Sequence, residues 1–267
     1  MRGAVGMPTF DTPAPVAVTV VLDTGRVRCV ATQRRDTAVA VLPAGTSAAA
    51  IAAAEQTTIE HGAGLLTVKA PHRAILRPGG GIDVFLEVPA GSSLEVHTVR
   101  ADIRTEGELG DCRFSTVTGP IHLEHVGALR VSTSGSDVVA GYVAGVVDVQ
   151  GATASVRLQE CAADVAVSTA NGGITVVRAA GSVRAKTANG SIRVGELVRG
   201  AAELSTARGS VEIGIAAGTA AHVDARSTLG SVHNLLEVRT GPEGFAERVN
   251  VHARTWYGTI TIQRAMP

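Results

Sequence analysis

The sequence predicts an all-β protein, most of it a β-solenoid of single-stacked coils of about 18 residues each. Three observations support this prediction: a repeat that runs from Leu94 toward the C-terminus, alternation of apolar and polar residues with a period of two, and an aromatic content of only 3%. Alternation with that period is typical of strands with one buried face. Few aromatic rings are expected in a narrow interior where like side chains stack at about 4.8 Å per layer.

The repeat is clearest in three consecutive units that begin at Val165, Val183 and Ala202. They read VAVSTANGGITVV, VRAKTANGSIRVG and AELSTARGSVEIG, so each unit has a strand pattern on both sides of a turn. Each unit is therefore expected to form one coil, stacked in sequence order on the next. The first position of the pattern is small or aliphatic throughout: Leu94, Cys112, Leu129, Val147, Val165, Val183, Ala202, Val223 and Val251.

The turns leave two architectures open. Asn-Gly, at Asn171–Gly172 and Asn189–Gly190, is a strong signal for a β-hairpin, which would make the units an antiparallel meander. Such a meander would have about eighteen strands, whereas open twisted sheets rarely exceed about ten. A coil of about 18 residues instead flattens into two faces of roughly 20 Å at the usual spacing of sheets. We therefore expect the solenoid, with Gly172, Gly190, Gly209 and Gly258 in turns where glycine tolerates a positive φ.

Like positions on neighbouring coils are expected to interact laterally. The repeated threonine can form hydrogen-bonded pairs across strands, and the outward positions alternate in charge. Arg184 should lie beside Glu203, and Arg193 beside Glu212. Such exposed pairs contribute about 0.2–1 kcal/mol each, so they help to fix register more than they add stability.

The repeat region is expected to span residues 92–267. Residues 10–91, which precede it, are expected to form a β-rich N-terminal cap. Residues 1–9 are expected to be flexible, with Met7 an alternative start to Met1. Ser47–Gln56 is rich in alanine and predicts a short helix, and Pro78–Gly81 predicts a turn or mobile loop. Strands are predicted at Val16–Leu22, Gly25–Ala31, Ala38–Leu42, Leu65–Ala70 and Ile82–Val88.

A solenoid needs both ends covered, because bare strand edges pair with other chains. Residues 10–91 are expected to close the N-terminal end as an irregular first part of the same stack. At the other end, the last repeat interval contains an insertion at about 240–248, with a turn signal at Gly241–Pro242. This insertion and the Trp256–Tyr257 pair are the candidates for the C-terminal cap.

Charge and composition exclude several classes of protein. The chain has 24 Lys and Arg against 24 Asp and Glu, so it lacks the positive charge on which nucleic-acid binding depends. No apolar run approaches the roughly 20 residues of a membrane-spanning helix, and we expect no direct membrane insertion. Cys29, Cys112 and Cys161 are odd in number and widely spaced, which favours a reducing compartment over a disulfide framework. With no signal-peptide pattern at the N-terminus, a cytoplasmic protein is expected.

No motif of a known catalytic or metal site is present, and the sequence predicts no catalytic residue, cofactor or metal ion. The His122-Leu-Glu-His125 segment suggests a pair of metal ligands. However, strand alternation places His122 and Glu124 on one side of the strand and His125 on the other side or in the turn. His222 and His233 are expected to point outward. A glycosidase needs two carboxylates about 5–10 Å apart, whereas Asp148 and Glu203 should lie three layers apart, about 14 Å.

These observations favour a non-catalytic β-solenoid that serves as a scaffold or protein-interaction module. Trp256 and Tyr257 are the only cluster of large rings, and exposed aromatic residues often anchor interfaces. We therefore expect a protein partner or self-association, with these two residues as the candidate contact. The alternative is a solenoid enzyme that modifies a saccharide or another envelope polymer, which would require a groove with two carboxylates, or a carboxylate with Arg or Lys, on neighbouring coils.

The three units quoted above, the lead-in IDVFLEVPAGSSLEV (Ile82–Val96) and the opening MPTFDTPAPVAVTV together resemble a bacterial family of β-strand-repeat domains labelled "putative adhesin" and related to toastrack domains. The likeness is closest to actinobacterial members of cytoplasmic type and covers the chain from Met7 onward. It implies a β-solenoid-like fold. It implies no established reaction and no catalytic residues, and relatives are associated with the sensing of membrane stress.

Overall fold

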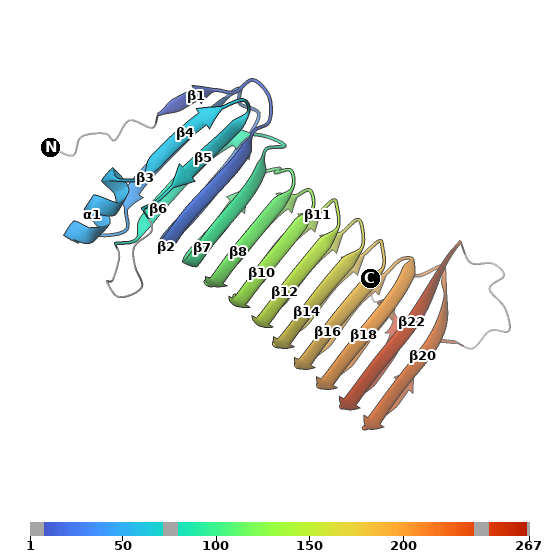
Figure 1. Cartoon of the computed structure of the whole chain (residues 1–267). Helices are drawn as coiled ribbons and strands as arrows, with labels where there is room; N and C mark the ends of the chain where they lie inside the picture. The colour runs from blue at the N-terminus through green and yellow to red at the C-terminus, as the bar shows by residue number, and fades with distance from the viewer. Residues whose placement is uncertain (1–7, 72–79, 238–245, 266–267) are drawn as a thin grey trace. The chain divides into compact units, whose positions relative to one another are not determined.

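Stacked strands and one short helix make up the chain, which is described by a computed structural model over residues 8–71, 80–237 and 246–265 (Figure 1). The chain divides into two compact units, Met1–Gly127 and Ala128–Pro267. In both units most strands pair in parallel with strands of neighbouring coils, so the predicted β-solenoid is confirmed and the antiparallel meander is wrong.

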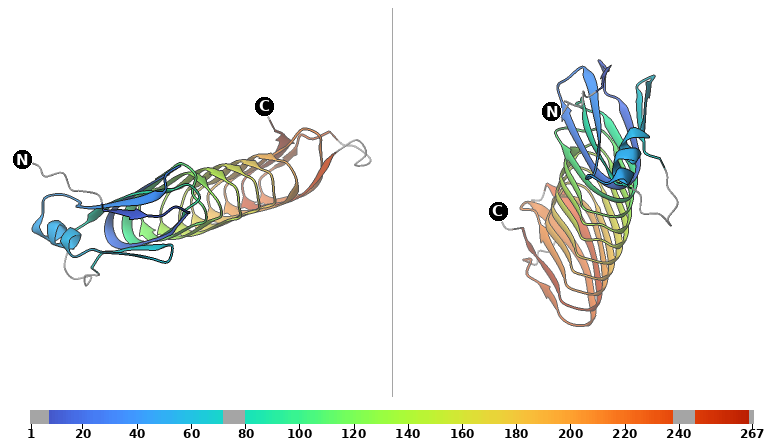
Figure 2. Two further views of the ribbon diagram at one scale, coloured as in Figure 1. Left: turned by 90° about the horizontal axis from the view of Figure 1, so that it is seen from above. Right: turned by 90° about the vertical axis from the view of Figure 1, so that its left-hand side faces the viewer.

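The second unit consists of coils that each contribute one strand to each of two opposing faces (Figure 2). One face contains β10 (Leu129–Gly135), β12 (Val147–Thr153), β14 (Val165–Asn171), β16 (Val183–Asn189), β18 (Gly200–Arg208), β20 (Thr219–Leu229) and β22 (Glu247–Tyr257). The other contains β11 (Val138–Val143), β13 (Val156–Cys161), β15 (Ile174–Ala179), β17 (Ile192–Leu197), β19 (Val211–Ile215), β21 (Val232–Asn234) and β23 (Ile260–Arg264).

Repeat positions stack in register to form the core of this unit. Val147 pairs with Val165, and Val165 pairs with Val183. These inward side chains, like Ile174 and Ile192 on the other face, are at most 2% exposed. Aliphatic and small residues fill the narrow space between the two faces, which is the reason for the scarcity of aromatic rings.

The Asn-Gly turns connect the two faces of a coil and do not form hairpins. Gly172 and Gly190 have φ angles of 128° and 155°, far from the value near +60° that a type I′ hairpin turn requires. The amide of Gly172 donates to the carbonyl of Asn189 in the next coil, and the side-chain amide of Asn189 donates to Asn171 at 2.9 Å. Turns therefore stack on turns, just as strands stack on strands.

The threonine column does not form the cross-strand hydroxyl pairs that the sequence suggested. The hydroxyl of Thr206 instead donates to the carbonyl of Gly190, one coil away, at 2.9 Å. Thr187 makes the same bond to Gly172 at 3.2 Å. These threonines thus join their strands to the turn of the neighbouring coil, whereas Thr133 donates to Ser136 and Thr169 to Asn171 within their own coils.

At its C-terminal end the second unit departs from sequence order. β22 pairs with β18 on one side and with β20 on the other, so the last coil in the sequence is inserted before the preceding one (Figure 1). Ala202 pairs with Val251, and Val251 pairs with Val223. The hydroxyl bonds follow the same order, since Thr255 donates to Gly209 and Ser227 donates to Gly258.

The prediction that Trp256 and Tyr257 cap the C-terminal end is therefore wrong. Trp256 and Tyr257 belong to β22, the second coil from the end, and they do not cover the last coil, which is formed by β20 and β21. The physical reason is that Val223 and Val251 fit the repeat equally well, so the pattern allows either order. Residues 238–245, with most of the predicted insertion and the Gly241–Pro242 turn, lie outside the described residues.

Ten elements are found in the described residues of the first unit. They are β1 (Thr9–Asp11), β2 (Ala17–Thr32), β3 (Asp36–Pro43), α1 (Ala48–Glu55), β4 (Thr58–Gly62), β5 (Leu65–Lys69), β6 (Ile82–Pro89), β7 (Ser93–Glu106), β8 (Cys112–Thr118) and β9 (Ile121–Val126). The predicted helix is present, and Ser47 caps it by accepting a hydrogen bond from the amide of Ala50. Met1, Met7, Pro78 and Gly79 lie outside the described residues, and Gly80 and Gly81 have no regular structure.

The segment before the repeats contributes complete coils to this unit. β2 pairs in parallel with β7 along one side, and with β5 and β6 along the other. The two strands predicted at Val16–Leu22 and Gly25–Ala31 are one strand, because Gly25, with a φ of 148°, bends the chain at the corner without interrupting the pairing.

Antiparallel strands and the helix cover the outer side of the first unit. β4 pairs with β5, β3 pairs with β6, and β1 pairs with β3, all antiparallel. Neither β1 nor β4 was predicted from the sequence. The hairpin of β4 and β5 turns at Ala63 and Gly64, both with positive φ, and the Gly-Ala-Gly sequence was the available signal for it.

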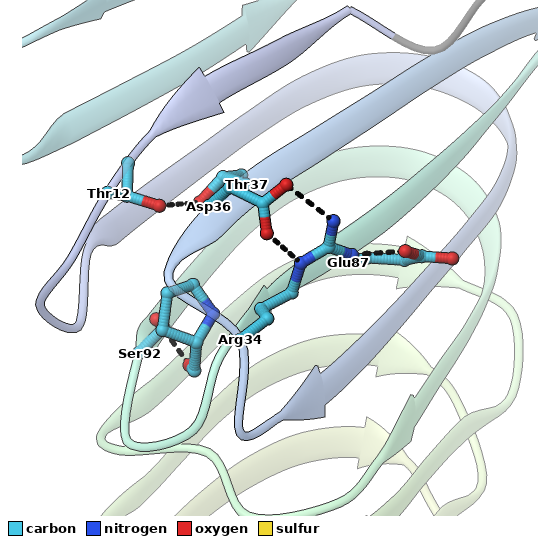
Figure 3. A network of polar contacts seen from close by, with 7 residues as sticks. Thr12, Arg34, Asp36, Thr37, Glu87 and Ser92 are labelled. Atoms are coloured by element: carbon cyan, nitrogen blue, oxygen red, sulfur yellow. Dashed lines mark hydrogen bonds and ion pairs between the residues drawn. The ribbon is translucent and has the colours of Figure 1, made fainter.

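A polar network fastens this antiparallel layer to the coils (Figure 3). Arg34 donates to both carboxylate oxygens of Asp36 and pairs with Glu87 of β6. The hydroxyls of Thr12 and Thr37 lie 2.8 Å apart and are buried. The guanidinium of Arg34 holds the pKa of Asp36 below its usual value, mainly through the hydrogen bonds.

Candidate interaction surface

Trp256 and Tyr257 lie at the end of β22 and are 59% and 50% exposed. Tyr257 pairs with Arg208 of β18 on one side and with Leu229 of β20 on the other. Leu229 is 55% exposed. We call Arg208, Leu229, Trp256 and Tyr257 the aromatic corner. Arg208, Tyr257 and Leu229 form one row across three strands, and Trp256 precedes Tyr257 on β22. Aromatic rings and guanidinium groups commonly anchor protein interfaces.

The aromatic corner is accessible because its neighbours in the stack are small. Register places Ala207 opposite Trp256 on the inner side and Thr228 on the outer side. Neither side chain is large enough to cover an indole ring. The chain before the corner is held firmly, since Thr255 is 4% exposed and its hydroxyl donates to Gly209 at 3.0 Å. The two rings are thus presented from a rigid strand end.

The flanking lateral surfaces are ladders of paired charges. Arg184 donates to both carboxylate oxygens of Glu203, and Arg193 lies 3.5 Å from Glu212, which confirms the predicted pairs. Hydrogen bonding by the Arg184 guanidinium lowers the pKa of Glu203 below its usual value. Arg178 joins Glu160 and Glu196 across three coils. These ion pairs help to hold the coils in register.

An open groove of about 770 Å³ crosses β10, β12, β14 and β16 in the second unit. Small residues, Gly151, Ala166 and Ala170, are among those that line it. Its charged lining residues are Asp148, Arg184 and Lys186. Glu203 lies three strands from Asp148 and is bound to Arg184. The two carboxylates are not brought together, as the sequence predicted.

A second cavity, of about 510 Å³, lies in the first unit and contains two carboxylates. Asp83 of β6, Arg26 of β2 and Asp102 of β7 form a row across three adjacent strands. At about 4.8 Å per strand the two aspartates are roughly 10 Å apart. Arg26, between them, lies 2.5 Å from Asp83, and Arg104 donates to both oxygens of Asp102.

Both carboxylates of this row are bound by guanidinium groups, Asp83 by that of Arg26 and Asp102 by that of Arg104. Asp83 is 5% exposed, with Oδ2 held by Arg26 and Oδ1 without a hydrogen-bond partner among the described residues. The arrangement is that of a structural ion pair at the coil corner. Sequence reasoning missed it, because the parallel pairing of β2 with β6 and β7 was not predicted.

The histidines singled out in the sequence do not gather. His125 lies 3.9 Å from Glu124, whose carboxylate accepts a hydrogen bond from the amide of Gly107. His233 lies 3.0 Å from the hydroxyl of Ser231, and His222 pairs with Asn250 of β22. Within the described ranges, no group of three His, Cys, Asp or Glu residues is placed to hold a metal ion.

The three cysteines are buried and unpaired with one another. Removal from water raises the pKa of Cys112 and of Cys161 to about 12, and burial also raises the pKa of Cys29. A thiol with so high a pKa is a poor nucleophile near neutral pH, because the thiolate is the reactive form. These residues pack as small hydrophobic side chains in the core.

Comparison with known proteins gives a family match and structural neighbours. Residues 53–262 match the family model described as Toastrack DUF4097. A crystal structure described as a putative adhesin from Bacteroides fragilis is 10% identical and covers 97% of this chain and 98% of its own, with a TM-score of 0.47. Another, from Parabacteroides distasonis, is 11% identical with 98% coverage of both chains and a TM-score of 0.41. A search of curated proteins finds no match.

Proposed function

Since this chain belongs to the Toastrack DUF4097 family, we propose that it is a non-catalytic β-solenoid scaffold that binds another protein through the aromatic corner. The main support for the proposal is the exposure of Trp256 and Tyr257, 59% and 50%, directly after the buried residue Thr255 of the same strand. Exposed aromatic residues on a rigid support lose little conformational entropy on binding, which makes them effective anchors.

The proposal places the protein in the cytoplasm. It is supported by three free cysteines, since thiols remain reduced there. Among the residues that the structure describes, no helix is long and apolar enough to span a bilayer.

The alternative, an enzyme acting on a saccharide or another envelope polymer, would use the cavity of the first unit. Its two aspartates, roughly 10 Å apart, are slightly further from each other than the carboxylates of an inverting glycosidase, at about 6.5–9.5 Å. However, Arg26 occupies the space between them that a substrate or water would need, and Arg104 holds Asp102. We therefore favour the scaffold.

Removing the two rings should abolish binding and leave the fold intact. We expect Trp256→Ala/Tyr257→Ala to reduce capture of the partner from a lysate of the native host at least tenfold, since anchor residues contribute about 2 kcal/mol or more. The melting temperature should change little, because both side chains are exposed. The measurement is quantitative affinity capture with the tagged full chain.

Val177→Ala is the matched control, because Val177 is 43% exposed on an inner coil of the same unit. This variant should capture as much partner as the wild type. If the double variant captures as much as the control, the aromatic corner is not the binding site. If the wild type captures no more than the tag alone, the scaffold proposal fails.

A further inference from the structure

The second unit ends in an open strand edge. β20 pairs with β22 from Thr219 to Leu229, and β21 pairs with β23. On their other sides, neither β20 nor β21 has a partner in the part of the chain that the structure describes. In the first unit, by contrast, the outer strands β5 and β6 are covered by β4 and β3. An uncovered edge presents unpaired backbone groups to which another strand can bind.

Interior positions are also exposed at this end. Val232 is 41% exposed, whereas Ile260, its partner one coil further in, is fully buried. Val223 and Ala225 are half-buried, whereas their partners Val251 and Ala253 are fully buried. Val223, Ala225 and Val232, together with Leu229 and Leu235, give this end of the stack an apolar surface. Leu229 and Leu235 are 55% and 63% exposed. Covering it would remove this surface from water.

Several of the usual protections of an edge strand are missing from β20. Natural edges carry proline, lysine or other charged side chains, or a bulge that prevents pairing, and of these β20 has only the charged pair Asp224 and Arg226. β20 reads TAAHVDARSTL, with neither proline nor lysine, and its pairing with β22 shows no shift of register. The strand is long, regular and exposed, which is unusual unless something pairs with it.

The charges on β20 are self-complementary. Asp224 and Arg226 flank Ala225 and lie on the outward face, with 31% and 74% of their side chains exposed. If two β20 strands pair antiparallel about a two-fold axis through Ala225, Asp224 of each copy lies opposite Arg226 of the other. Side chains directly opposite in an antiparallel pair have Cβ atoms about 5 Å apart, so both ion pairs can form in exchange for the present bond from Arg226 to Asp224 of its own strand. The same register places Leu229 opposite Ala221.

We infer that two copies of this chain join end to end through antiparallel pairing of their β20 strands, centred on Ala225. The pairing satisfies the open edge and covers the exposed apolar positions of both copies. A two-fold interface is self-complementary and closes at two copies, so it does not produce a fibre. The inference goes beyond the proposed function, since the pairing needs no other protein; it shares Leu229 with the aromatic corner and uses neither Trp256 nor Tyr257.

The test is the mass of the full chain in solution, by light scattering and sedimentation. The wild type should have twice the mass of the 27.2 kDa chain. Asp224→Arg and Arg226→Asp each place like charges opposite one another at both positions, and each should weaken the dimer at least tenfold. An equimolar mixture of these two variants should restore a complex of two chains, as should the double variant Asp224→Arg/Arg226→Asp.

Asp148→Arg is the control, because Asp148 occupies the same outward column on β12, away from the edge. This variant should remain a dimer. The inference is overturned if the wild type is a monomer at about 100 µM, if its dimer survives both single variants, or if the mixture stays monomeric. Growth into open-ended polymers would also overturn it, since this would indicate head-to-tail contact. Trp256→Ala/Tyr257→Ala should still dimerise, so this test and that of the proposed function fail independently.

Discussion

Replacing Gly190 by alanine should unfold the second unit at a markedly lower temperature than in the wild type. Gly190 has a φ of 155°, a conformation that side chains rarely adopt, and a Cβ added there would lie 2.0 Å from the carbonyl oxygen of Gly172. The neighbouring coils cannot separate, because strands on both faces hold them in register. Backbone strain and overpacking each cost about 1–3 kcal/mol, so we expect a loss of about 2–6 kcal/mol.

Gly173→Ala is the matched control at the same corner. Its added Cβ would meet only the carbonyl oxygen of Ser191, at 3.6 Å, which is an ordinary contact. Thermal and urea unfolding, followed by circular dichroism, should show a large loss for Gly190→Ala and little change for Gly173→Ala. Equal stability of both variants would show that the turns are not stacked as described.

Truncation of Phe114 should cause the second large loss of stability. Phe114 of β8 is 1% exposed and pairs with Val96 of β7 at the third position of the repeat. It is the largest of the fully buried side chains in the described structure. Phe114→Ala leaves a cavity in a stack that cannot collapse around it, and such changes cost about 3–5 kcal/mol. The free energy of unfolding measured in urea should fall by that amount.

The neighbouring outward residue provides the comparison for this change. Ser115 lies on the same strand but is exposed, so Ser115→Ala should alter stability by no more than about 0.5 kcal/mol. The decrease in the free energy of unfolding should therefore be several-fold larger for Phe114→Ala than for Ser115→Ala. A loss below about 1 kcal/mol for Phe114→Ala would contradict the buried position of this ring.

The repeat made most of the fold predictable from the sequence. Period-two alternation located the strands of the inner coils, and like positions such as Val165 and Val183 are paired in register. The predicted Arg184–Glu203 pair is present because register determines which outward residues meet. Local pattern and tertiary contact agree here, since each coil contacts its neighbours in the stack.

The order of the coils at the ends was not predictable, because the repeat pattern carries no information about which coil lies outermost. Val223 and Val251 fit the interior equally well, yet β22 lies between β18 and β20. The first unit shows the same kind of insertion, because β2 lies between β7 on one side and β5 and β6 on the other. β2 and β22 are thereby each paired on both sides, an order that depends on contacts between residues far apart in the sequence.

The candidate surfaces were predictable only in part. Trp256 and Tyr257 stood out because large rings are rare in this sequence, and the structure places them at an exposed strand end. The open edge of β20 was missed, because sequence order would have placed this strand between two others. The row of Asp83, Arg26 and Asp102 was missed for a related reason, since its strands are far apart in the sequence.

The most direct test of the stacked arrangement is disulfide formation between engineered cysteines. Glu203 pairs with His252 across β18 and β22, whereas Asp224 lies one strand further away. Paired positions about 4.8 Å apart satisfy disulfide geometry, and positions two strands apart do not. The native cysteines are buried and should not interfere. Glu203→Cys/His252→Cys should form an intramolecular disulfide under mild oxidation, and Glu203→Cys/Asp224→Cys should not; the reverse result would contradict the insertion of the last coil.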